Sequence, residues 1–200
     1  MKKILLLCAL MVSASMTCVG QTAKEVLDKC AEVVGAKGGI KASFTMESAQ
    51  YGNTSGTIEI KGKKFHAATP QATMWFDGTT QWTYLQHNNE VSVITPTESQ
   101  LQALNPYNFI NMYKQGFKTT MTKNATACIV HLTAKDAKHK IQEIFVTIEK
   151  KNYHPSEIKM LQGQKWTTFH VTDLKTTKLD DSVFSFHSKD FPTAEVIDLR

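Results

Sequence analysis

Residues 74–84 read Met-Trp-Phe-Asp-Gly-Thr-Thr-Gln-Trp-Thr-Tyr, and this stretch decides the fold more than any other. The Asp-Gly pair at 77–78 is a strong hairpin signal, because these residues tolerate the backbone angles of tight turns. The aromatic residues on both sides favour β-strands. If the loop holds two or four residues, Trp75, Trp82 and Tyr84 fall on one face, because side chains alternate along a strand. Three large rings on one face predict an apolar cover, which is either the protein's own core or a ligand.

A second turn at His87–Glu90 extends this face. It predicts that Val91 lies opposite Gln86 and that Val93 lies opposite Tyr84. With that register, one continuous apolar face comprises Trp75, Trp82, Tyr84, Val91 and Val93, whereas Gln81, Thr83 and Ser92 lie on the other face.

The beginning of the chain has the pattern of a secretory signal peptide. Met1-Lys2-Lys3 is basic, residues 4–12 are apolar and residues 13–20 are mostly small. We therefore expect residues 1–20 to be cleaved and residues 21–200 to form a single exported domain. Cys18 leaves lipid anchoring open, since a lipidated cysteine would tie the chain to a membrane. The residues before Cys18 match a lipoprotein signal poorly, so we expect Cys18 to be removed with the signal.

Two cysteines, Cys30 and Cys128, remain after the signal peptide. An exported compartment permits a disulfide between them. Both fall at apolar positions, one in a predicted helix and one in a predicted strand, and buried free thiols are common. We favour two buried thiols over a bridge.

The basic residues are almost all lysine. The formal net charge is +5, including Lys2 and Lys3 of the signal, and Arg200 is the sole arginine. Proteins that read nucleic acid depend on arginine for forked and stacked contacts. Scattered lysines on an exported protein indicate solubility or weak attraction to anionic membranes, so we expect no nucleic-acid partner.

Hydrophobic periodicity predicts one helix followed by a long series of strands. The helix spans Ala23–Val34 and ends at Gly35. Strands are predicted at 40–46 and 58–60, and a tight turn at Gly62-Lys63 pairs Ile60 with Phe65. After the two hairpins described above, further strands are predicted at 117–123, 126–133, 141–149, 157–161 and 166–171, with a short edge strand at Val183–Phe186. Two short helices are predicted between the strands, at 98–104 and from Asn105-Pro106 onward. About ten sequential strands argue for one large, strongly curled antiparallel sheet with helices on one side.

The sequence has no recognisable catalytic or metal-binding constellation. Its seven histidines do not have metal-ligand spacing, and no nucleophile elbow or phosphate-binding loop is present. Asp77 is explained by turn chemistry, and Asp180-Asp181 beside Lys178 predicts a solvated loop. We expect no enzymatic activity, no metal and no cofactor.

Several segments together resemble the periplasmic outer-membrane lipoprotein carrier family, the LolA-like carriers of the Lol system. The segments are Gly39–Thr45, Gly56–Lys61, Trp75–Tyr84, Asn105-Pro106 and Phe184-Ser185-Phe186, and they occur in the family's order over nearly the whole mature chain. The resemblance implies a mainly β (α+β) fold, an incomplete and strongly curved antiparallel β-barrel whose apolar concave face is covered by α-helices. It also implies a non-enzymatic periplasmic carrier that shields acyl chains between an inner-membrane release complex and an outer-membrane acceptor.

The resemblance assigns acyl-chain binding to the concave face and a lid role to the helices. The expected lipid-binding residues are Phe44, Met46, Ile58, Ile60, Phe65, Trp75, Trp82, Tyr84, Val91 and Val93. The expected lid residues are Phe109, Ile110, Met112 and Tyr113. The cargo would be acylated lipoproteins or other amphiphilic molecules, carried by a monomer. An outer-membrane-anchored acceptor or an envelope lipid-sensing module is the alternative function, and a purely structural core is the alternative for the aromatic residues.

One segment departs from the family pattern. The carriers usually have an arginine in a strand near the lid, where it helps to hold the closed state. Here the corresponding residues are Lys61-Gly62-Lys63-Lys64-Phe65. Lysine cannot make a forked contact, so the latch role is not assigned to any of these lysines.

Overall fold

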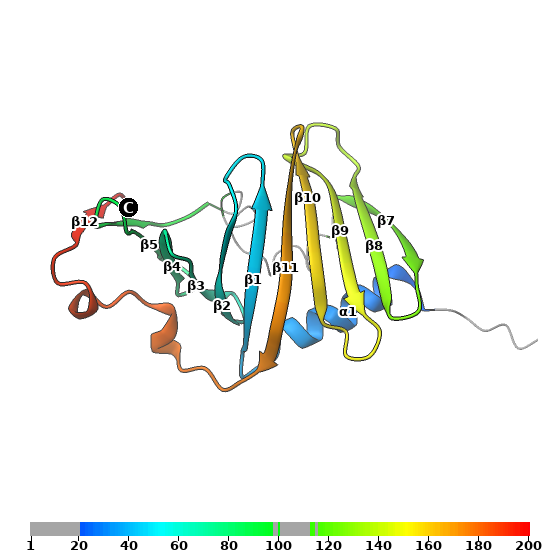
Figure 1. The fold of residues 1–200 in the computed structure, drawn as a ribbon, viewed down its shortest axis with the longest axis horizontal. Helices are drawn as coiled ribbons and strands as arrows, with labels where there is room; N and C mark the ends of the chain where they lie inside the picture. Colours follow the sequence, from blue (N-terminus) through cyan, green and yellow to red (C-terminus); the bar gives the residue numbers. More distant parts are fainter. Residues whose placement is uncertain (1–20, 98–99, 101–112, 115) are drawn as a thin grey trace, which may run out of the picture.

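The structure, a computed structural model, describes residues 21–97, 100, 113, 114 and 116–200. Within these residues the dominant feature is one 12-stranded sheet with the strand order β12-β6-β5-β4-β3-β2-β1-β11-β10-β9-β8-β7. Neighbouring strands are antiparallel except β12, which pairs parallel to β6. The helix α1 crosses one face of the sheet (Figure 1).

The elements follow one another along the chain with short turns between most strands. In the first half they are α1 (Ala23–Val34), β1 (Ile40–Ser48), β2 (Thr54–Lys61), β3 (Lys64–Ala68), β4 (Ala72–Phe76), β5 (Gln81–Leu85) and β6 (Glu90–Ile94). In the second half they are β7 (Phe117–Lys123), β8 (Ala127–Ala134), β9 (Ile141–Glu149), β10 (Pro155–Gln162), β11 (Lys165–Thr176), the 3₁₀-helices η1 (Asp181–Phe184) and η2 (Ser188–Asp190), and β12 (Glu195–Asp198). The curved, unclosed antiparallel sheet with a helix on one face confirms the predicted fold class.

The helix α1 has the predicted bounds. It begins with a capping box, in which the Thr22 hydroxyl accepts from the Glu25 backbone N–H at 3.2 Å and the Glu25 carboxylate accepts from the Thr22 backbone N–H at 2.8 Å. Its apolar stripe is fully turned toward the sheet, with Val26, Leu27 and Cys30 all 0% exposed. Burying each such side chain stabilises the fold by roughly 1.5–3 kcal/mol, so packing holds α1 in place.

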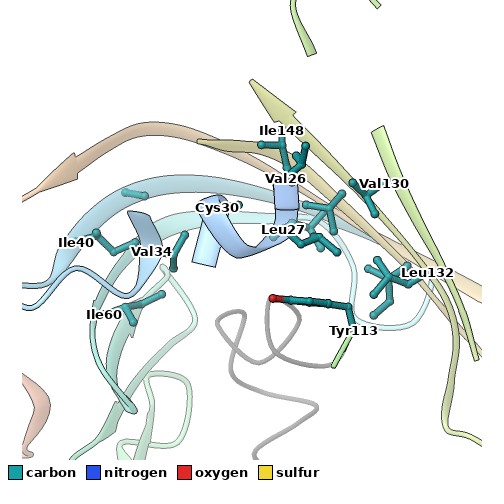
Figure 2. Close-up of a cluster of buried hydrophobic side chains, with 14 of the residues drawn as sticks. Val26, Leu27, Cys30, Val34, Ile40, Ile60, Tyr113, Val130, Leu132 and Ile148 are labelled. Atoms are coloured by element: carbon teal, nitrogen blue, oxygen red, sulfur yellow. The ribbon is translucent and has the colours of Figure 1, made fainter. Parts of the chain in front are cut away.

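The register of the strands defines two faces of the sheet. Ile40 pairs with Ile60, Ile60 pairs with Phe65 and Phe65 pairs with Phe76. Directly paired residues point to the same side, and these four belong to the buried cluster that includes α1. We call this side the α1 face and the opposite side the outer face. Figure 2 shows the strands arching around α1, with Ile40, Ile60, Val130, Leu132 and Ile148 near the helix.

In both hairpins each side chain lies on the face that the sequence predicts. The register of the second hairpin differs from the predicted one. The loop after β4 has four residues, and the Asp77 carboxylate accepts from the backbone N–H groups of Thr79 and Thr80, both at 2.8 Å. Asp77 is therefore the turn residue that the sequence predicts. In the next hairpin Tyr84 pairs with Val91, so the predicted pairing of Val91 with Gln86 is wrong by two residues. An even shift keeps every side chain on its predicted face.

Two further details of the chain differ from the sequence prediction. Val183–Phe186 does not form an edge strand, because Asp180 caps a 3₁₀-helix over Asp181–Phe184 by accepting from the Ser182 backbone N–H at 2.9 Å. The edge strands of the sheet are β12 and β7, and β12 is not among the predicted strands. Of the segments predicted as short helices at 98–104 and after Asn105, residues 98, 99 and 101–112 lie outside the described residues, as do residues 1–20.

Both remaining cysteines are free and buried, as predicted. Cys30 lies on α1 and Cys128 on β8, and both belong to the cluster between α1 and the sheet. Burial raises the pKa of the Cys30 thiol to about 12, because a thiolate would lose its hydration there. Cys30 is therefore a neutral packing residue at physiological pH.

The last part of the chain, residues 177–200, runs back along the sheet to its far edge, and we call it the C-terminal strap (Figure 1). It is fastened where it leaves β11. Thr177 and Leu179 each donate a backbone hydrogen bond, to the carbonyls of Gly39 and Gly38, at 3.0 and 2.9 Å. Gly39 has φ +105°, and a side chain there would collide with Leu179. A glycine is therefore required at position 39 for the strap to pack closely.

Candidate functional site

The α1 face carries the buried hydrophobic cluster of the described residues. Its cluster joins α1 to residues of most strands of the sheet, and all of its members are hydrophobic. Strands β8 and β9 contribute four fully buried members, each 0% exposed: Val130, Leu132, Ile144 and Ile148. A face of this kind can cover an apolar ligand.

The helix covers this face unevenly. Near its beginning, Gln21 donates to the Tyr153 hydroxyl at 3.0 Å and accepts from Lys123 at 3.0 Å. Those two partners lie in the β9–β10 turn and at the end of β7, so α1 follows one end of the strands. At its other end, Val34 packs in the cluster with Ile40, at the start of β1.

Half-buried apolar side chains lie toward the opposite strand ends. We call the set of Phe44, Met46, Met160 and Phe169 the strip; it spans the neighbouring strands β1, β11 and β10. Met46 pairs with Phe169, Phe169 pairs with Ile158 two residues before Met160, and the Phe44 and Phe169 rings lie 6.3 Å apart. These side chains combine partial exposure with continuity to the buried cluster. The strip is the candidate binding surface.

Methionine is concentrated on the α1 face. Met74, Met121 and Met160 pack against the buried cluster, and Met46 shares the face of Phe44 by strand alternation. Methionine is flexible and polarizable, so it adapts to irregular apolar partners. Met160 and Phe169 are not among the predicted site residues. The alternation of Ile158 with Met160 in a predicted strand was the available signal.

The structure divides the ten predicted lipid-binding residues between two faces. The five on the α1 face are Phe44, Met46, Ile58, Ile60 and Phe65. The five on the outer face are Trp75, Trp82, Tyr84, Val91 and Val93. The reason is one step of alternation, since Phe76 pairs with Phe65 on the α1 face and the adjacent Trp75 must point the other way. The expectation of one common trough is therefore wrong.

The outer-face aromatic residues are covered by the C-terminal strap. Trp75 makes edge-on ring contacts with Phe186 and Phe191, at 5.6 and 5.5 Å between centroids. Tyr84 lies 4.6 Å from Phe191 by the same measure, and Val91 is fully buried. Such ring pairs add about 0.5–1.5 kcal/mol beyond area burial. The protein's own chain thus supplies the cover that the aromatic hairpin requires.

A charged clasp secures the strap to the sheet. Lys61 donates to the Leu179 carbonyl at 2.8 Å and to the Asp181 carboxylate at 2.9 Å, and Lys64 binds the same carboxylate at 2.9 Å. Asp181 is therefore more than the solvated loop residue that the sequence suggested. The lysines of the segment that departs from the family pattern hold the strap.

Because of the clasp, we expect the difference in stability between the wild type and a variant at Asp181 to depend on pH. The hydrogen bonds from Lys61 and Lys64 lower the pKa of Asp181 from 3.8 to about 2. A carboxyl group with a lower pKa in the folded state stabilises the fold above its unfolded pKa, and this contribution is lost as the pH falls through the folded value. We expect Asp181→Asn to lower the thermal midpoint at neutral pH and to approach the wild type near pH 2. Calorimetry across this range, with the exposed Asp190→Asn as the control, tests it; an equal difference at both pH values contradicts it.

Of the expected lid residues, only Tyr113 lies within the described part of the chain. Its side chain is 7% exposed, and its hydroxyl donates to the Asp28 carboxylate of α1. Hydrogen bonds from Lys24 and then Tyr113 lower the pKa of Asp28, while burial and the Asp28 carboxylate raise the pKa of Tyr113. Phe109, Ile110 and Met112 lie outside the described residues, and their lid role stays a prediction.

The described residues offer little for other kinds of site. No group of three histidine, cysteine, aspartate or glutamate side chains among them is placed to hold a metal ion. In the same part of the chain, no helix has the length and apolar character needed to cross a bilayer.

Comparison with known proteins gives a family and a fold. The family model of the outer membrane lipoprotein carrier protein LolA matches residues 14–164. A search of curated proteins finds no match. An uncharacterized conserved protein from Thermus thermophilus has a similar structure, with a TM-score of 0.60 and 13% identity over 89% of this chain and 99% of that one.

Two further solved structures are more distant. A LolA superfamily protein from Nitrosomonas europaea has a TM-score of 0.46 and 12% identity, over 83% of this chain and 98% of its own. An outer membrane lipoprotein-sorting protein domain from Vibrio parahaemolyticus, described as putative, has a TM-score of 0.46 and 14% identity, over 81% of this chain and 95% of its own.

Proposed function

Because the chain belongs to the outer membrane lipoprotein carrier family, we propose that it is a periplasmic carrier that shields acyl chains of lipoproteins on its α1 face. The observation that carries the proposal is the strip. Phe44, Met160 and Phe169 are half-buried and pack against an entirely hydrophobic cluster, and the half-buried Met46 pairs with Phe169. A surface built only to stabilise the fold has no need to leave such side chains partly exposed.

The strength of acyl-chain binding must be intermediate. Each methylene transferred from water to an apolar site contributes about 0.8 kcal/mol, so an acylated protein does not leave a membrane unaided. The carrier must offer comparable apolar cover and still release its cargo. The strip is already partly covered without ligand, which lowers the net gain on binding and favours release.

The transfer route follows from the family. The cargo is an acylated lipoprotein, taken from an inner-membrane release complex and delivered to an outer-membrane acceptor. Residues 1–20 act as the export signal, and Phe109, Ile110, Met112 and Tyr113 act as a lid over the bound chains. Shielding of acyl chains needs apolar contact and no catalytic step.

Bound lipid is the direct test. The chain is expressed with its signal peptide and purified without detergent, and extracted lipid is identified by mass spectrometry. We expect co-purifying acyl chains, and a protein mass that corresponds to an N-terminus after residue 20. Purified protein that never carries lipid or binds an acylated peptide contradicts the proposal. A lipid-modified Cys18 on the purified protein would instead identify an anchored acceptor.

A further inference from the structure

The strand ends farthest from α1 form a basic rim. The register joins these ends directly, because Ser48 pairs with Thr167 and Met160 pairs with both Thr167 and Ile144. The end of β8 and the start of β7 meet at the same side of the sheet, because the Lys135 backbone N–H donates to the Gly116 carbonyl at 2.8 Å. The turns β1–β2, β8–β9 and β10–β11 therefore lie at one end of the sheet, at the top of Figure 1, whereas α1 lies near the bottom.

Lysine dominates this rim. All five of its lysines are exposed, and they are Lys118, Lys135, Lys138, Lys140 and Lys165. The acidic residues at these strand ends are Glu47, Asp136 and Glu143, and Glu143 lies 2.8 Å from the His131 ring. Five lysines and three carboxylates give the rim a net charge of +2, whereas the whole chain has +5 including the two lysines of the signal.

An exposed aromatic side chain stands on the same rim. Tyr51, in the β1–β2 turn, is 63% exposed and is one of three large hydrophobic side chains in the described residues that are so open to solvent. Tyrosine favours the boundary between water and lipid, because its ring is apolar and its hydroxyl is polar. Lysines with a tyrosine among them match the chemistry of an anionic bilayer surface.

The rim also adjoins the strip. Met46 and Met160 are each two residues from the rim ends of their strands, Ser48 and Gln162. We propose that the rim docks on anionic phospholipid headgroups and turns the strip toward the bilayer. Charge complementarity favours a bilayer, whose anionic headgroups attract each nearby lysine. The docking is reversible and sensitive to salt, because exposed charges are screened.

The test uses lipid-free protein and vesicle flotation. Vesicles of phosphatidylglycerol and phosphatidylcholine are compared with vesicles of phosphatidylcholine alone, at low and physiological ionic strength. We expect at least tenfold stronger partition to the anionic vesicles, weakened by salt. The triple variant Lys118→Glu, Lys135→Glu and Lys138→Glu is expected to lose at least tenfold of that partition, and Tyr51→Ala a smaller part.

A matched control separates the rim from net charge. Lys37, Lys63 and Lys189 are also exposed and lie away from the rim, so their triple change to glutamate alters total charge equally and is expected to retain at least half of the binding. Equal losses in the two triple variants, or no preference of the wild type for anionic vesicles, overturn the proposal. Binding to polyglutamate without binding to vesicles also overturns it in favour of an acidic protein partner. Because no acyl cargo is present, this result is independent of the proposed carrier function.

Discussion

Met160→Asp is expected to reduce the affinity for an acylated peptide by at least tenfold while the fold is retained. Met160 is half-buried on the α1 face between Ile144 and Thr167. Full burial of a methionine side chain is worth about 1.5–3 kcal/mol, and a carboxylate beside an acyl chain adds a desolvation penalty. Titration of a fluorescent palmitoylated peptide measures the change.

The next residue along β10 provides the matched control. Leu161 is also half-buried, but it points to the outer face, where it pairs with Trp166. Leu161→Asp introduces the same charge in the same strand, and its affinity for the peptide is expected to stay within about twofold of wild type. Equal losses in the two variants would mean that the effect comes from the strand and would contradict a binding site on the α1 face.

Phe184→Ala is expected to lower the free energy of unfolding by about 3–5 kcal/mol. Phe184 is 0% exposed and closes η1, directly after the Asp181 clasp. Removing a fully buried aromatic ring leaves a cavity in addition to the lost transfer energy. Urea unfolding followed by tryptophan fluorescence measures the loss.

A substitution at a second strap residue tests whether any change in the C-terminal strap lowers the stability as much as Phe184→Ala does. Val196 on β12 is 50% exposed, so Val196→Ala is expected to change stability by no more than about 0.5 kcal/mol. At a temperature where the Phe184→Ala variant is folded, that variant should bind the acylated peptide like the wild type. A stability loss below about 1 kcal/mol would contradict the structural role of the strap, and a selective loss of peptide affinity would move the lipid site to the outer face.

The elements of this fold were predictable because they depend on local periodicity. The apolar stripe and the capping box specify α1 within the chain itself, and the Asp77 turn specifies the parity of the aromatic hairpin. The predicted register after His87 was wrong, because a loop of uncertain length allows pairings that differ by two residues. The predicted faces were still correct, because a register shift by two residues leaves each side chain on the same face of the sheet.

The division of the site between two faces was not predictable from one sequence. Trp75 and Phe76 are adjacent, and both are aromatic, so hydrophobicity alone does not tell which one joins the α1 cluster. The answer depends on what covers each side: α1 on one and Phe186 and Phe191 of the strap on the other. The strap lies more than a hundred residues after Trp75 in the chain. No local sequence pattern predicts that it pairs parallel to β6.

The same long-range contact explains the lysines in the segment that departs from the family pattern. By sequence, the region of Lys61 and Lys64 is notable for a missing arginine. In the structure both lysines bind Asp181, which only the folded strap brings near. Lysine is sufficient there because a single carboxylate and one carbonyl need no forked donor.

The location of bound acyl chains tests the central claim most directly. A palmitoylated peptide with a photoreactive group on its acyl chain is bound, irradiated and mapped by tandem mass spectrometry. We expect the adducts to fall on the strip, at Phe44, Met46, Met160 or Phe169. Adducts on the outer face, at Trp82 or Tyr84, would contradict the proposal that the α1 face binds acyl chains.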